Sequence, residues 1–204
     1  MKNVIFDFGN VLVRWEPEKV YAEYFGDEAR AWWFLRHVLD NDSRLRIDAG
    51  DGMQHCLAEV QARHPGYDDA IAIFASRWRD MLTGEMPGMY ALVEELKGRT
   101  AVYGLTNWSM ETFPEARRMF PILQLIDRYV VSGAERLVKP DERLYMVLLG
   151  RYGLAADECI FVDDNPVNVD AARRLGMDGI VFAGADDLRR RLETVMPTTN
   201  TLQI

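Results

Sequence analysis

The sequence has few of the residues on which thiol and imidazole chemistry depends. Its 204 residues include only two cysteines, Cys56 and Cys159, and three histidines. The cysteines have neither a metal-ligand spacing nor a disulfide framework, and both stand among apolar residues, so we expect a reducing compartment. No serine or cysteine is arranged with a histidine as a nucleophilic pair. Any catalytic chemistry must therefore use other groups.

Long apolar runs and clusters of positive charge are also missing. No apolar stretch approaches the roughly 20 residues that a membrane-spanning helix needs, and residues 1–3 lead directly into a short strand rather than a secretory signal. The net charge is -8, and the one basic cluster, residues 189–191, fits the solvated face of a C-terminal helix. We therefore expect a cytoplasmic protein that binds neither nucleic acid nor membranes.

The periodicity of the chain changes along its length. Residues 3–8 have the continuous apolar pattern of a strand buried on both faces. Residues 16–86 show no convincing strand, and Trp32, Trp33 and Phe34 are predicted to be core residues of a helix there. The helices predicted in this segment are Pro17–Tyr24, Asp27–Leu39, Gly52–Arg63 and Tyr67–Met81.

From Pro87 onward helices and strands alternate. Strands are predicted at 101–105, 129–131, 159–162 and 179–182, and helices at 87–97, 109–119, 141–152, 166–175 and 186–195. Such repeated units predict an α/β fold, a doubly wound Rossmann-like parallel sheet. We expect a discontinuous core made of residues 1–15 and 87–204, with residues 16–86 inserted as a helical cap.

Polar residues follow the predicted strands, where a doubly wound sheet binds its ligands. The strands and their loops deliver Asp7, Thr106 with Asn107, Lys139, and Asp163 with Asp164 to this edge. Asp7 alone could be a turn residue, and Asp164 alone could cap a helix. A carboxylate at the end of a buried strand is unfavourable unless something uses it, and three together predict a divalent-metal site.

These fragments, in this order, resemble the motifs of the haloacid dehalogenase-like (HAD) hydrolase superfamily, in its helical-cap type. The four fragments are Phe6–Leu12, Leu105–Asn107, Val138–Asp141 and Phe161–Pro166. The residues of these motifs most resemble those of a branch of cytoplasmic sugar phosphatases that includes bacterial α-D-glucose-1-phosphate phosphatase. The resemblance implies a Mg²⁺-dependent phosphatase that forms an aspartyl-phosphate and acts on a small phosphorylated metabolite.

The resemblance also implies roles for individual residues. Asp7 would be the nucleophile and Lys139 a fixed positive charge between Asp7 and the phosphate. The phosphate would be held by Asn10, Thr106, Asn107 and Lys139. Mg²⁺ would be bound by Asp7, the backbone carbonyl of Gly9 and Asp164, with Asp163 as an alternate ligand or a support for the others.

Gly9 departs from the usual pattern, because phosphatases of this superfamily have a second aspartate at that position to protonate the leaving oxygen. Its loss is compatible with a phosphatase whose substrate leaves readily, which favours sugar 1-phosphates. It is also compatible with a 2-haloacid dehalogenase, although Asp163 and Asp164 disfavour a carboxylate substrate. The third alternative is a catalytically silent protein that binds a phosphorylated ligand.

Substrate choice should depend on the cap. Trp15 follows the first motif closely enough to line the entrance, and Arg44, Arg46 and Asp48 lie in a polar stretch between cap helices where they could contact sugar hydroxyls. A solvated turn explains that stretch equally well. We expect the cap to open and close on hinges near residues 13–16 and 84–88. The protein should be a monomer or a homodimer.

Overall fold

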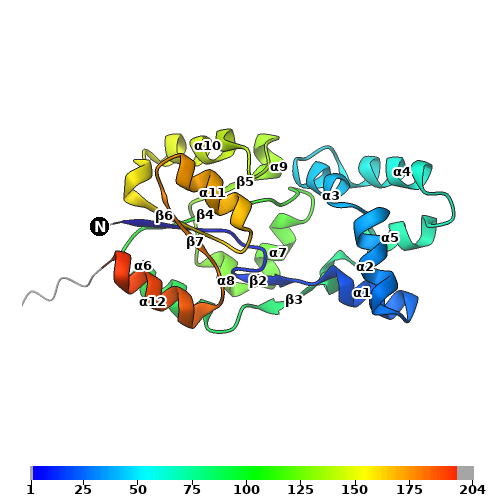
Figure 1. The fold of residues 1–204 in the computed structure, drawn as a ribbon, viewed down its shortest axis with the longest axis horizontal. Coiled ribbons are helices and arrows are strands. Elements are labelled where there is room, and N and C mark those ends of the chain that lie inside the picture. The colour runs from blue at the N-terminus through cyan, green and yellow to red at the C-terminus, as the bar shows by residue number, and fades with distance from the viewer. Residues whose placement is uncertain (1, 197–204) are drawn as a thin grey trace, which may run out of the picture.

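A five-stranded parallel sheet forms the centre of the computed structural model, which describes residues 2–196 (Figure 1). The strand order is β5-β4-β1-β6-β7, so the first strand of the chain lies in the middle. The strands are β1 (Asn3–Phe6), β4 (Val102–Thr106), β5 (Tyr129–Val131), β6 (Cys159–Asp163) and β7 (Asp178–Val181). Every residue of β4 and β6 is buried, as the apolar runs predict for a sheet covered on both faces.

Helices cover both faces of the sheet, which confirms the predicted α/β fold. Figure 1 shows α6 (Met89–Lys97) and α12 (Ala185–Val195) on one side, and α10 (Glu142–Tyr152) and α11 (Pro166–Arg174) on the other. Each side has its own apolar core, since alternate residues of β1 point to opposite faces. The shorter helices α7 (Phe113–Met119), α8 (Pro121–Gln124) and α9 (Ser132–Glu135) complete the body around the sheet.

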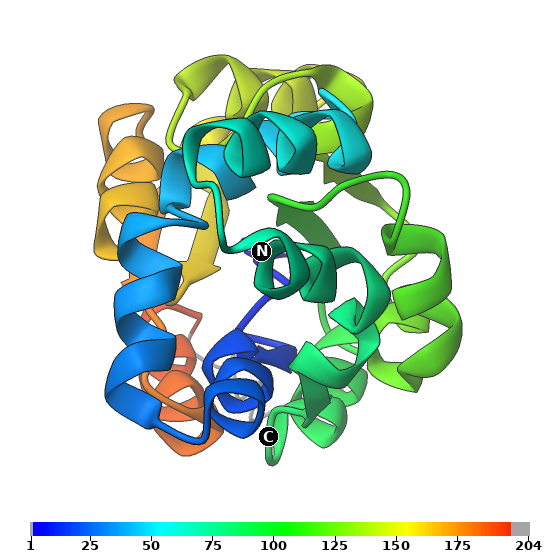
Figure 2. The ribbon, with the colours of Figure 1, turned by 90° about the vertical axis from the view of Figure 1, so that its right-hand side faces the viewer.

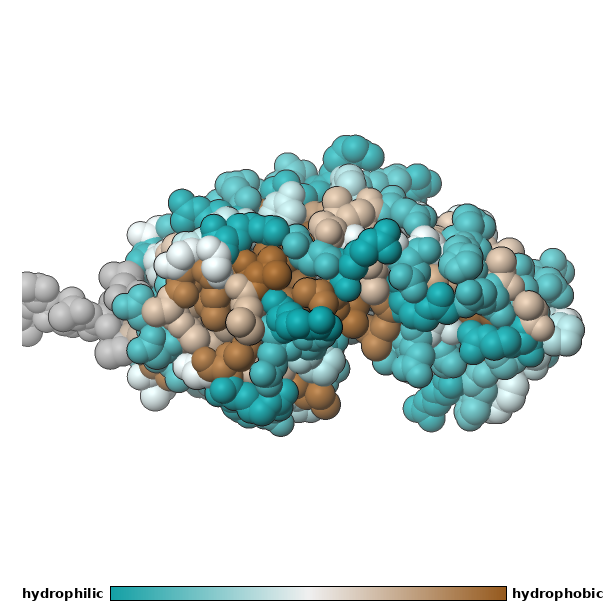
Figure 3. Space-filling view, turned by 90° about the horizontal axis from the view of Figure 1, so that it is seen from above, coloured by the Kyte–Doolittle hydropathy of each residue, from teal (hydrophilic) through white to brown (hydrophobic). Residues whose placement is uncertain are grey.

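Residues 17–81, here called the cap, form a second group of helices beside the carboxyl ends of the strands. They comprise α1 (Pro17–Phe25), α2 (Glu28–His37), α3 (Asn41–Asp48), α4 (Met53–Arg63), α5 (Asp68–Ser76) and a 3₁₀ turn at Trp78–Met81. They share a separate apolar core around Tyr21, Phe34 and Ile71. Figure 2 shows the cap in front of the sheet, and Figure 3 shows a notch between the two parts.

Two strands in the connections to the cap are absent from the sequence-based prediction. β2 (Val13–Trp15) and β3 (Leu82–Glu85) pair antiparallel, so the segment 16–86 does contain a strand. The prediction was wrong because Thr83, Gly84 and Glu85 lack the alternation of a half-buried strand. The ribbon lies at both predicted hinges, and Gly84 in it has a φ of +141° that favours glycine.

The cap differs from the prediction in three further places. Residues 41–48 form helix α3 rather than a polar turn, since the carboxylate of Asp40 accepts a hydrogen bond from the Ser43 backbone N–H at 2.8 Å. Trp32 and Trp33 are each 46% exposed, and of that aromatic run only Phe34 is buried. The helix predicted at 67–81 ends at Ser76 before the 3₁₀ turn. No helix among residues 2–196 is long and apolar enough to cross a membrane.

Candidate active site

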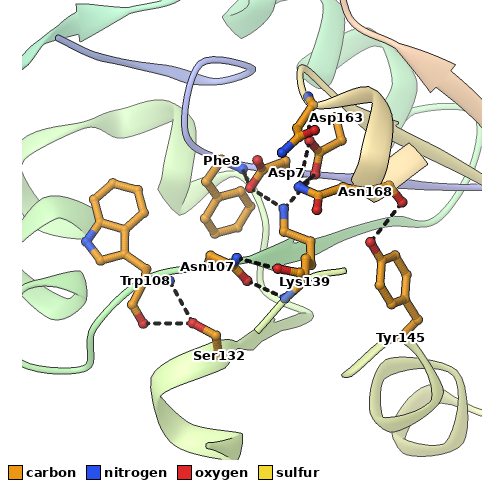
Figure 4. A network of polar contacts seen from close by, with 10 residues as sticks. Asp7, Phe8, Asn107, Trp108, Ser132, Lys139, Tyr145, Asp163 and Asn168 are labelled. Atoms are coloured by element: carbon orange, nitrogen blue, oxygen red, sulfur yellow. Dashed lines mark hydrogen bonds and ion pairs between the residues drawn. The ribbon is translucent and has the colours of Figure 1, made fainter. Parts of the chain in front are cut away.

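Lys139 lies between two aspartates at the carboxyl edge of the sheet. Its Nζ is 2.9 Å from Asp7 Oδ1 and 2.7 Å from Asp163 Oδ2, and its side chain is 1% exposed (Figure 4). Burial opposes the positive charge, but the attraction of Asp163 and Asp7 outweighs it and raises the pKa of Lys139. Lys139 is therefore a fixed cation that ties the end of β1 to the end of β6.

Asp7 follows β1 directly and is 8% exposed. Its Oδ1 accepts a hydrogen bond from the Phe8 backbone N–H at 2.6 Å as well as the contact with Lys139. Burial raises the pKa of Asp7 to about 7, and Lys139 limits this rise. Because both contacts use Oδ1, Oδ2 is the freer oxygen and the one available to attack phosphorus.

Asp163 is fully buried and surrounded by donors. Its Oδ1 accepts from the Asn165 backbone N–H at 2.8 Å, and the Asn168 amide lies 3.1 Å from both of its oxygens. The amide of Asn168 and the ammonium of Lys139 therefore fix its orientation. Asp164, the next residue, is exposed.

Carboxylate oxygens of Asp7, Asp163 and Asp164 all lie within 4.8 Å of one another. Three carboxylates beside the single ammonium of Lys139 leave an excess of negative charge, which a divalent cation would balance. The hard oxygen donors suit Mg²⁺. Since protein donors already occupy both oxygens of Asp163, Asp7 and Asp164 are the residues better placed to bind an ion directly.

The second motif supplies an amide and a hydroxyl. The Asn107 side chain donates to the Lys139 carbonyl at 3.1 Å and accepts from the Lys139 N–H at 2.8 Å, so it holds the lysine loop in place. Thr106 is 1% exposed, and its Oγ1 has no hydrogen-bond partner among residues 2–196. A buried hydroxyl without a partner is rare, and a bound anion would satisfy it.

A cavity of about 310 Å³ opens over these groups and is lined by both the core and the cap. Its polar end contains Asp7, Gly9, Asn10, Asn107 and Asp164. The apolar part of the lining, here called the apolar wall, includes Trp15, Leu45, Met53, Phe74, Trp78 and Trp108.

The structure brings most of the predicted site residues to this cavity. Trp15, Arg44 and Asp48 line it, while Thr106, Lys139 and Asp163 lie buried behind the residues that do. The Asn10 Oδ1 accepts from the Trp15 backbone N–H at 2.9 Å, which orients the first motif. Arg46 is not in the lining, because its guanidinium pairs with Asp51 and Glu59 on the exposed face of the cap.

Several lining residues were not predicted as site residues from the sequence. Met53, Phe74 and Trp78 come from separate cap helices, and their apolar character marks them only as core candidates. Ser109 and Thr112 lie just outside the second motif, which ends at Asn107, so the motif does not indicate them. Only the packing of the cap on the core brings these residues together.

A doubly wound sheet with a buried lysine and three aspartates at its carboxyl edge, covered by a helical insertion, defines a capped α/β enzyme. A family model described as haloacid dehalogenase-like hydrolase matches residues 1–176, and the chain belongs to this family. The match confirms the resemblance seen in the four motifs and shows that the protein is a hydrolase.

Known proteins similar to this chain include both a phosphatase and a dehalogenase. It is 31% identical over 186 residues to the sesquiterpene phosphatase astK of Aspergillus oryzae, covering 88% of each chain. HAD family enzyme BT-2542 from Bacteroides thetaiotaomicron, in complex with magnesium and inorganic phosphate, has a TM-score of 0.69 and 18% identity, covering 94% of this chain and 98% of that one. L-2-haloacid dehalogenase from Xanthobacter autotrophicus has a TM-score of 0.63 and 17% identity, covering 96% and 84%. The two structural matches show the fold alone.

Proposed function

We propose that this protein is a Mg²⁺-dependent phosphatase that hydrolyses a small phosphorylated metabolite through an aspartyl-phosphate on Asp7. The observation that carries the proposal is the position of Asp7. One of its oxygens is held by Lys139 and the Phe8 N–H, and the residue lines a cavity closed by the cap. The similarity to astK supports phosphate rather than halide as the group removed.

In the first step Oδ2 of Asp7 attacks phosphorus, and the bond from phosphorus to the leaving oxygen breaks. The leaving oxygen takes up a proton. In the second step water attacks the phosphorus of the aspartyl-phosphate, loses a proton, and releases phosphate while the Asp7 carboxylate re-forms. Lys139 holds Oδ1 throughout, and the Thr106 hydroxyl and the backbone near Asn107 would bind phosphate oxygens.

The donor set fits the metal that the family implies. Asp7, Asp164 and the backbone carbonyl of Gly9 would hold Mg²⁺, and Asp163 would orient the site through Lys139 and Asn168. When bound, the ion would offset the repulsion between the Asp7 carboxylate and a phosphate dianion.

The walls of the cavity bear on the substrate. Because the lining includes tryptophan, phenylalanine and aliphatic side chains of the cap beside its polar groups, the cavity suits a phosphate ester with an apolar organic group. A sugar 1-phosphate is the second candidate. It is favoured by Gly9, which provides no acid beside the nucleophile, since an anomeric oxygen is less basic than an ordinary alkoxide.

The test is phosphate release from a panel of prenyl phosphates, sugar 1-phosphates, sugar 6-phosphates and 2-haloacids, with Mg²⁺ or with EDTA. We expect Mg²⁺-dependent release that Asp7→Asn abolishes, and higher kcat/KM for the prenyl phosphates than for the sugars. EDTA-insensitive halide release without phosphate release would instead indicate a dehalogenase. Phosphate binding without turnover, kept or strengthened in Asp7→Asn, would indicate a silent binding protein.

A further inference from the structure

Two positions after the nucleophile, where phosphatases of this superfamily carry a second aspartate as the acid, this chain has Gly9. At Gly9 a Cβ would meet no atom within 4 Å, so the place where a second acid could stand is open space. Loss of a positioned acid typically costs about 10² to 10⁴ in rate. A phosphatase acting on an ordinary ester therefore needs a donor from elsewhere in the cavity.

Four side chains that line the cavity can carry a charge, namely Asp7, Arg44, Asp48 and Asp164. Asp7 is the proposed nucleophile, and Asp164 faces the proposed cation site. The Arg44 guanidinium donates to the carbonyls of Leu35 and Leu39, each at 3.2 Å, so it ties cap helices together. Asp48 is the one of these four side chains that neither the attack on phosphorus, nor the cation site, nor the packing of the cap helices uses.

Asp48 is docked against the phosphate end of the cavity although it belongs to the cap. Its backbone carbonyl accepts a hydrogen bond from Ser132 Oγ at 2.6 Å, and the same hydroxyl accepts from the Trp108 N–H at 2.8 Å. Asp48 and Ser109 both line the cavity. These contacts place the end of α3 beside the loop that follows Thr106 and Asn107.

The surroundings of Asp48 favour its protonated form. Burial raises the pKa of Asp48 to about 7, and the charges of Arg44 and Lys139 with the Ser109 N–H limit the rise. Asp48 is also the last residue of α3, where the helix dipole disfavours a negative charge. A bound phosphate would disfavour ionised Asp48 further, since like charges repel.

We propose that Asp48 is the acid and base of the reaction, donating a proton to the leaving oxygen and then accepting one from the attacking water. This inference rests on the proposed phosphatase function and assigns to the cap the role that Gly9 leaves vacant. In the first step the carboxylic acid becomes a carboxylate as the leaving group becomes an alcohol. In the second step the proton that water loses restores the acid, so the cycle closes without another reactant.

If Asp48 supplies the proton, the argument from Gly9 for a readily leaving sugar 1-phosphate loses its force. The enzyme could then hydrolyse esters of ordinary alcohols, which agrees with the apolar wall. Because Asp48 belongs to the cap, the acid would also be in place only while α3 is docked on the core. Cap closure would then control proton transfer as well as the entry of water.

The test uses substituted phenyl phosphates, which share one shape but differ in leaving-group basicity. Asp48→Asn keeps the size and the polarity of the side chain, but no acid remains. We expect kcat/KM of this variant to fall by about 10² or more with p-methoxyphenyl phosphate and to change little with p-nitrophenyl phosphate. The wild type should depend only weakly on the leaving group. Asp42→Asn, at an exposed position on the same helix, should match the wild type with both substrates.

The pH profile gives an independent readout. With the poor leaving group, kcat/KM of the wild type should fall as the pH rises above about 7, where Asp48 ionises, and Asp48→Asn should lack this fall. Equal losses with both substrates would show that Asp48 only docks the cap, and no loss with either would show that the proton comes from elsewhere. Both results overturn the inference while leaving the phosphatase standing. A wild type that releases no phosphate under any condition would instead overturn the proposed function.

Discussion

Lys139 is the residue on which the site depends most strongly. A fully buried ammonium is unfavourable unless it is paired, and here two carboxylates from different strands pair with it. The pairing explains why Asp7 and Asp163 can both lie at the sheet edge. Lys139 could be predicted as a site residue from the sequence, because it precedes Pro140 and Asp141 in one of the four motifs.

Replacing Lys139 by methionine should strongly destabilise the fold. The change leaves Asp7 and Asp163 as buried, uncompensated charges, and we expect a loss of about 3–5 kcal/mol in the free energy of unfolding. Urea denaturation in EDTA measures this, with the exposed Lys19→Met as the control. The second change Asp163→Asn should restore part of the loss, since it removes one of the unpaired charges. A stability equal to that of the wild type would contradict the description of this cluster.

At the level of elements, the sequence predicts the sheet and the four cap helices α1, α2, α4 and α5, but it misses α3 and the β2–β3 ribbon. A strand such as β6 is a short apolar run that ends in a site residue, here Asp163. The apolar pattern and the family motif therefore indicate the same stretch of sequence as a strand. β2 and β3 have no such pattern, because they are stabilised by pairing with each other. Helix α3 is too polar to show an apolar face in the sequence, and Asp40 at its N-cap is the main local feature that indicates a helix there. The apolar wall of the cavity is formed by residues far apart in the sequence, so no single stretch of sequence predicts it.

The contact of the loop after α3 with α9 offers a test of how the cap docks. Gly50 has a φ of +87°, and a Cβ there would lie 2.7 Å from the backbone carbonyl oxygen of Gly133. Gly50→Ala should therefore push the cap away from the core and lower kcat/KM for p-nitrophenyl phosphate by about 10- to 100-fold. The same clash predicts a lower thermal midpoint.

Gly66→Ala is the matched control for this change. Gly66 has a similar φ of +92°, but a Cβ there would meet nothing within 4 Å. The Gly66→Ala variant should therefore lose only about 1–2 kcal/mol in the free energy of unfolding, from backbone strain, and keep wild-type kcat/KM. If Gly50→Ala and Gly66→Ala behave alike, close docking of the cap is not needed for turnover.

At the scale of the molecule, the proposed metal site joins the two ends of the core sequence. Asp7 follows the first strand, and Asp164 lies more than 150 residues further along, yet carboxylate oxygens of the two lie within 4.8 Å of each other. A Mg²⁺ ion bound between these carboxylates would remove their mutual repulsion and so stabilise the folded chain.

Mg²⁺ should therefore raise the thermal midpoint of the wild-type protein relative to EDTA. At about 100 times the dissociation constant the gain is about 2.7 kcal/mol. Asp164→Asn should lose most of this gain, whereas Asp157→Asn, at an exposed position before β6, should keep it. Equal Mg²⁺ effects in both variants would place the ion elsewhere.

The most direct test of the central claim is to trap the covalent intermediate. The wild-type enzyme is mixed with a turned-over phosphate ester and Mg²⁺, quenched in acid, reduced with borohydride and mapped by peptide mass spectrometry. An aspartyl-phosphate is reduced to homoserine, so we expect homoserine at position 7 only when ester and Mg²⁺ are both present. Turnover without modification at position 7, or with modification at another aspartate, would contradict it.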